Sequence, residues 1–186
     1  MLTAPGWRGG HGNRQALGGF ILGLMAGGVT AGMVLWVLAG LATVVPATAA
    51  TALVVMAVAG GIVHEFGVHR FRLPENRRLI PIEVFARHPV VAGGQFGFEL
   101  GTGVRTYLPS VTPYVLAAAV GLLGAGGAAP LLAGLGFGLG RALMPISRNL
   151  AGGSEEWDLE LARLAKTIGR TSILLVAVGL FAVLLR

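Results

Sequence analysis

Long apolar stretches separated by short polar connectors dominate the chain. A helix rises about 1.5 Å per residue, so roughly 20 apolar residues cross the roughly 30 Å hydrocarbon core of a bilayer. Each long apolar stretch therefore predicts a transmembrane helix. The predicted spans are residues 17–43, 47–66, 91–123, 127–145 and 170–185. The pattern predicts an all-α, polytopic membrane helix bundle of about five spans, forming a single integral membrane domain over residues 1–186.

The third stretch, 91–123, is too long for one straight crossing, because an unbroken helix of that length would reach about 50 Å. Pro109 and Pro113 interrupt it near 108–113. Each proline removes a backbone donor and crowds the carbonyl four residues earlier. Two crossings here would make six spans and move the charged connector after Met144 to the opposite side. We therefore expect one crossing, made by a Pro-broken third helix.

Two connectors have an amphipathic pattern. Ser154 can cap a helix whose first turn is acidic, and apolar residues from Trp157 to Ile168 recur at helical spacing. Such a helix would lie in the headgroup layer with Trp157 as its anchor. Residues 79–85 predict a second, shorter interfacial amphipathic helix.

Composition excludes several classes of protein. Hydrophobic residues make up 54% of the chain and charged residues only 12%, whereas soluble domains carry about 25% charge. A soluble globular enzyme is therefore disfavoured. The chain has no cysteine, so disulfides and thiol redox chemistry are excluded. His64 and His69 are five residues apart, one too many for a helical metal pair, and no phosphate loop or nucleophile motif is present. We expect no cofactor or metal, and enzymatic activity is disfavoured.

Charge placement predicts the orientation. The formal net charge is +6, and 13 of the 14 basic residues are arginine. They concentrate in the amino tail and in connectors 67–89 and 146–169, while the other two connectors are uncharged. The positive-inside rule places those basic segments and the N-terminus in the cytoplasm and the C-terminus outside. This explains the charge without nucleic acid, and the Ala-, Gly- and Arg-rich composition indicates a bacterial inner-membrane protein.

Glycines recur at four-residue intervals in two of the predicted spans. This spacing lets helix backbones approach closely within a bilayer. It permits tight packing inside the chain, a mobile bundle, or docking of another membrane protein or a second copy of this chain. The pairs and triplets are Gly19, Gly23 and Gly27; Gly28 and Gly32; Gly134 and Gly138; Gly136 and Gly140.

Ionisable and hydroxyl side chains inside the third stretch are candidate ligands for a solute. Entering near Val90, the helix places Glu99 about 13 Å and Arg105 about 22 Å into the membrane, where each charge is costly and by default functional. A break at Pro109 and Pro113 would also expose backbone polar groups, which transporters use to bind substrates. The candidate binding residues are Gln95, Glu99, Thr102, Arg105, Thr106, Tyr107, Ser110, Thr112 and Tyr114.

Three segments resemble one repeat of the CcdA/DsbD transmembrane proteins: FELG at 98–101, LPSVTPYVL at 108–116 and GLGRALMP at 138–145. The resemblance covers about fifty residues. It implies an architecture of two inverted three-helix repeats, here with one span missing from the first, and a cavity at Pro109 and Pro113. The disulfide-exchange activity of that family does not carry over, because its redox cysteines are missing.

Two functional hypotheses follow. The first is a transporter-like protein that binds or passes a small solute or ion at the break, with Glu99 and Arg105 selecting its charge. The second is a non-catalytic membrane subunit or assembly partner of a larger complex, docked through glycine faces.

Overall fold

The structure, a computed structural model, describes residues 10–68, 88–103, 108, 110–124, 127–152 and 155–185. Within these ranges the regular structure is helical and no strand occurs. The elements are α1 (Gly10–Leu41), the 3-10 helix η1 (Ala42–Val44), α2 (Ala47–Glu65), α3 (Pro89–Gly101), α4 (Thr112–Leu123), α5 (Ala129–Leu150) and α6 (Glu155–Leu184).

Four helices among the described residues are long and apolar enough to cross a membrane: α1 with η1, α2, α5 and α6. Many of their large apolar side chains are exposed, including Leu132, Leu175 and Phe181, as expected for surfaces that face lipid tails. Helices α3 and α4 have 13 and 12 residues, or about 20 and 18 Å, so each alone is too short to span. The all-helical fold and its apolar helices support the predicted membrane protein.

The last two long helices extend beyond the predicted spans. Helix α5 continues through Pro145 to Leu150, although proline removes one backbone hydrogen bond there. Helix α6 is continuous from Glu155, so the expected surface helix and the span 170–185 form one element. Good helix formers such as Glu, Leu, Arg and Lys favour this continuity. The connector 146–169 is therefore mostly helical, and the expected helix at 79–85 lies outside the described residues.

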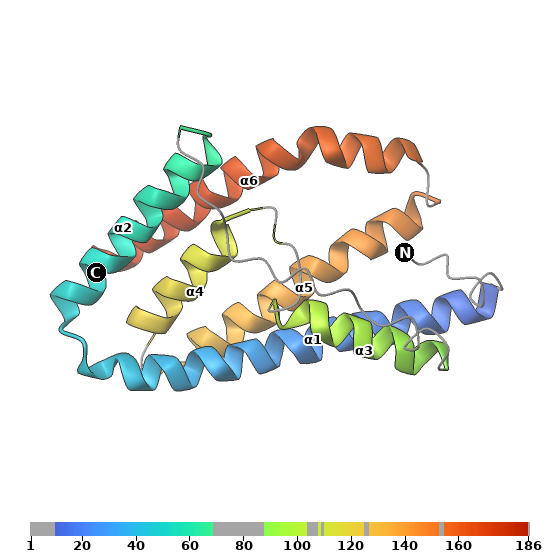
Figure 1. Ribbon diagram of the computed structural model, residues 1–186, viewed down its shortest axis with the longest axis horizontal. Helices are drawn as coiled ribbons and strands as arrows, with labels where there is room; N and C mark the ends of the chain where they lie inside the picture. The colour runs from blue at the N-terminus through green and yellow to red at the C-terminus, as the bar shows by residue number, and fades with distance from the viewer. Residues whose placement is uncertain are drawn as a thin grey trace.

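The helices form two groups joined by α4 (Figure 1). In the first, α1 packs against α3 and α5 around Phe20, Leu24 and Ala142. In the second, α2, α4 and α6 meet around Val111, Val115 and Ile173. Helix α4 also contacts α1 and α5, so it links the two groups.

Glycines let α1 pack closely against two helices at once. A methyl group at Gly23 would overlap the carbonyl oxygen of Gly94 on α3, and one at Gly28 would overlap that of Gly134 on α5. Contacts of Gly19 with Val90 and of Gly27 with Phe98 show that α1 and α3 run parallel. Close backbone approach supplies dispersion contacts where lipid removes the hydrophobic drive.

The predicted glycine faces therefore differ in whether they contact another helix of this chain. The predicted sets on α1, and Gly134 and Gly138 on α5, pack against helices of this chain, so tight internal packing is confirmed for them. A methyl group at Gly136 or Gly140 would meet nothing within 4 Å. Most of the glycines expected at helix contacts are therefore not available to another protein.

Candidate functional site

A glycine after its last turn ends α3, a stop that the proline pattern did not predict. Gly103 adopts a φ of 72°, a left-handed conformation that glycine tolerates and that commonly closes helices. Its amide N–H donates to the Leu100 carbonyl at 3.2 Å, and the Thr102 amide donates to Phe98 at 3.0 Å. Helix α3 therefore stops at Gly101, several residues before the prolines.

Helix α4 begins at Thr112 with Pro113 in its first turn, where a missing N–H costs nothing. The Val111 amide donates to the Glu65 carboxylate Oε1 at 2.8 Å. The Thr112 amide donates to the Ser110 hydroxyl oxygen at 3.1 Å. Pro113 thus starts a helix and does not kink one, while Pro109 lies outside the described residues.

The Glu65 carboxylate comes from the far end of α2 and is the polar centre of this junction. The Ser110 hydroxyl donates to Oε1 at 2.6 Å, beside the bond from Val111. On the opposite side, a methyl group at Gly169 of α6 would come within 2.7 Å of Oε2. The Arg170 guanidinium donates to the Glu65 carbonyl oxygen at 3.5 Å and lies 5.2 Å from the centre of the Phe66 ring. The Glu65 side chain at the end of α2 therefore lies against both the start of α4 and α6.

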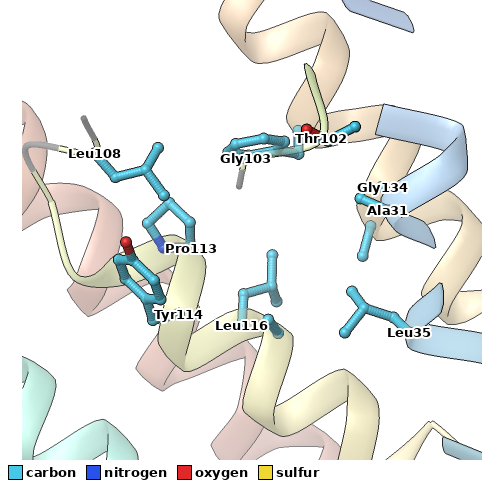
Figure 2. A pocket seen from close by; sticks show the side chains of 12 residues that line it. Ala31, Leu35, Thr102, Gly103, Leu108, Pro113, Tyr114, Leu116 and Gly134 are labelled. Atoms are coloured by element: carbon cyan, nitrogen blue, oxygen red, sulfur yellow. The ribbon is translucent and has the colours of Figure 1, made fainter. Parts of the chain in front are cut away.

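A cavity of about 360 Å³ lies beside the interval between α3 and α4. Figure 2 shows side chains from four directions facing it: α1, the end of α3, the start of α4, and α5. Its lining residues are Ala31, Leu35, Thr102, Gly103, Leu108, Pro113, Tyr114, Leu116, Ala117, Ala133, Gly134 and Phe137.

The lining is mostly apolar. Among the described residues, it contains no Asp, Glu, Lys, Arg or His side chain. Polar side-chain atoms come from Thr102 and Tyr114, and the Thr102 hydroxyl already donates to the Glu99 carbonyl at 2.9 Å. Sites of this kind bind mainly by apolar contact, with a few polar atoms fixing orientation. In the described part of the chain, no group of three or more His, Asp or Glu side chains could hold a metal ion.

The predicted site residues are divided among several places. Thr102, Pro113 and Tyr114 line the cavity, whereas Ser110 and Thr112 belong to the start of α4 beside Glu65. Gln95 and Glu99 lie half-buried on α3, outside the lining. The remaining predicted residues, Arg105, Thr106, Tyr107 and Pro109, lie outside the described residues.

Sequence reasoning missed Glu65 and Phe137. A signal for Glu65 was available, because a carboxylate in the last turn of a helix opposes the helix dipole. At the start of another helix the same charge is favourable, so an acidic end to an apolar span predicts a capped neighbour. Phe137 gave no such signal, since one more aromatic residue in an apolar helix is unremarkable.

Similarity to known proteins is limited. No protein-family model and no solved structure matches the chain. The methylamine utilization protein MauF of Paracoccus versutus is 33% identical over 141 residues, which are 75% of this chain and 48% of MauF. The chain thus spans about half the length of this relative, to which it is similar along most of its own sequence.

Proposed function

We propose that this chain is a transporter-like, multi-pass protein of the bacterial inner membrane that binds or passes a small neutral solute in the cavity between α3 and α4. One observation carries the proposal. Helices α3 and α4 are each too short to cross a membrane, and α3 ends and α4 begins beside an apolar cavity of about 360 Å³. Irregular backbone within a bilayer is tolerated where it is buried in protein or lines a cavity.

The directions of α2 and α4 favour a single crossing made by α3 and α4. Glu65 contacts the start of α4 and Gly61 contacts Val115, so α2 and α4 run antiparallel. The end of α4 therefore lies toward η1, which α4 contacts. Pro113 lies two residues after Val111, which contacts Glu65 at the end of α2, and from Pro113 the helix extends about 15 Å to Leu123. On this reading α3 and α4 together form the third of five crossings, with the N-terminus in the cytoplasm and the C-terminus outside.

The chemistry of the lining favours a neutral solute over an ion. A permanent charge would leave water for a surface that the described residues make apolar, at high cost. Charge selection by Glu99 and Arg105 has less support, because Glu99 lies outside the lining.

Cysteine labelling tests the cavity, because the chain has no cysteine of its own. Ala117→Cys places a thiol in the lining, and Ala118→Cys, one residue further, is the matched control outside it. In membranes, Ala117→Cys should react faster than the control with neutral N-ethylmaleimide. A trimethylammonium methanethiosulfonate should show no such preference. Equal rates at both positions with N-ethylmaleimide would contradict the proposal.

A second candidate function is an accessory membrane component of methylamine utilization, favoured by the similarity to MauF. Deleting the gene in its native host should slow growth on methylamine but not on ammonium. Normal growth on methylamine would count against this role. A further pair of variants tests whether the cavity serves growth on methylamine. If it does, Ala117→Phe should impair that growth and Ala118→Phe should not.

Kinship with the CcdA/DsbD proteins stays a prediction, as does association with another membrane protein. A pull-down in mild detergent tests the association, and recovery of this chain alone would count against it.

A further inference from the structure

We propose that Glu65 is a positioning residue for the cavity: its carboxylate caps α4 from another helix and so fixes the wall that Pro113 and Tyr114 present. This inference rests on the proposed function, because it assigns Glu65 a role in shaping that binding cavity. It concerns a side chain outside the lining, which acts through the first turn of α4.

The hydrogen bonds at the start of α4 show why the carboxylate is needed. The first amides of a helix have no partner within it. Here Val111 donates to Glu65 and Thr112 to Ser110, Pro113 has no N–H, and Tyr114 donates to the Val111 carbonyl at 3.0 Å. Ser110 is itself held by Glu65 at 2.6 Å. Glu65 therefore accepts one of these amide hydrogens directly and holds Ser110, which accepts the other and is also bonded to the Thr112 hydroxyl at 2.9 Å.

Electrostatics favour this particular arrangement. The carboxylate lies at the positive end of the α4 dipole, and at the unfavourable negative end of its own helix. It gains from the dipole of α4 only while α4 is docked beside it. In this half-buried site, an amide left without its acceptor is costly. Glu65 therefore stabilises the docked position of α4 over displaced ones.

Helix α6 fixes the carboxylate from the other side. The hydrogen atom of Gly169 leaves just enough room for Oε2, because a methyl group there would come within 2.7 Å. Arg170 holds the backbone of the same residue through its carbonyl oxygen. The position of the cap therefore depends on α6 as well as on α2.

The capped turn is also part of the cavity. Pro113 and Tyr114 follow Thr112 directly, and both line the cavity, as does Leu108 just before the capped segment. Figure 2 shows these three side chains together on one side of the opening, facing Leu35 and Ala31 of α1. Displacing the start of α4 would move this side relative to α1 and α5.

Spin labels can measure the position of α4 without any ligand. Cysteines at Gly121 of α4 and Gly179 of α6 give label sites with open space around them. Electron–electron distances should be narrowly distributed in the unmodified background. Glu65→Ala removes the acceptor and should broaden the distribution, shifting the docking equilibrium by roughly tenfold. Glu65→Gln keeps an uncharged acceptor and should have a smaller effect.

Two further variants separate positioning from general destabilisation. Phe20→Ala weakens the core that α1 shares with α3 and α5, which among the described residues includes none from α4, and should leave the distances unchanged. Gly169→Ala keeps the carboxylate but displaces it, and should reproduce the broadening. It also keeps the inference testable if Glu65→Ala does not fold. Unchanged distances in Glu65→Ala, or in Gly169→Ala if Glu65→Ala does not fold, would overturn the inference.

The labelling rate of Ala117→Cys gives the second readout. It should change severalfold when combined with Glu65→Ala and stay constant with Phe20→Ala. Broadened distances with an unchanged rate would overturn the inference, because Glu65 would then hold α4 without shaping the cavity. If Ala117→Cys fails to label preferentially even with Glu65 intact, the proposed function fails instead, and the distance measurement still shows whether Glu65 holds α4.

Discussion

Gly138 of α5 should be intolerant of even one added methyl group. In the structure, a Cβ at this position would lie 2.6 Å from the Leu24 carbonyl oxygen of α1. Carbon–oxygen contacts between helices are about 3.3 Å at the closest, so α1 and α5 would have to separate by about 0.7 Å. A gap of that size forfeits a quarter to a half of the dispersion energy of each contact beside it.

The neighbouring glycines provide matched controls. A Cβ at Gly136 or Gly140 would meet nothing within 4 Å. All three substitutions share the gain of about 1 kcal/mol that alanine brings to a helix interior, so this term cancels between them. The difference in unfolding free energy between the variants therefore reports only the cost of overpacking, which is about 1–3 kcal/mol. Gly138→Ala should therefore be less stable than Gly136→Ala by that amount.

The assay is reversible unfolding in mixed micelles with increasing sodium dodecyl sulfate, followed by far-ultraviolet circular dichroism. It compares the free energies of unfolding of Gly136→Ala, Gly138→Ala and Gly140→Ala under one condition. Equal stability of all three would refute the close α1–α5 packing, and with it the reasoning that assigns each glycine face a partner.

Two further predictions concern the second helix group and the turn between α5 and α6. Ile173 is fully buried against α2 and α4 while Leu175 is 73% exposed, so in the same assay Ile173→Ala should lose about 2 kcal/mol or more and Leu175→Ala close to nothing. A similar loss for both would mean that α6 does not pack as described. Arg148 and Asp158 form a two-bond ion pair at 2.8 and 2.9 Å, and since it is solvent-exposed, a double-mutant cycle should give a favourable coupling that declines as salt rises. A coupling insensitive to salt would contradict an exposed pair.

The candidate site was only partly predictable from the sequence. The interval between α3 and α4 begins after Gly101, before the interruption that Pro109 and Pro113 predicted at 108–113, and Thr102 and Tyr114 line a cavity beside it. The charge-selective site expected around Glu99 is not what the described lining offers. Local patterns place a residue along a helix, but they do not say which neighbour that helix will face.

Helical structure and the suitability of long helices for a bilayer were determined by the sequence itself, because apolar length and backbone hydrogen bonding are local properties. Tertiary structure alone decided which glycines are buried. Gly134 and Gly138 share their spacing with Gly136 and Gly140, yet only the first pair contacts α1. The tertiary structure also places Glu65 beside Ser110 and Val111, which are 45 and 46 residues away in the sequence. Such contacts depend on how whole helices pack, and the free energy of that packing is a sum over distant residues that no local pattern contains.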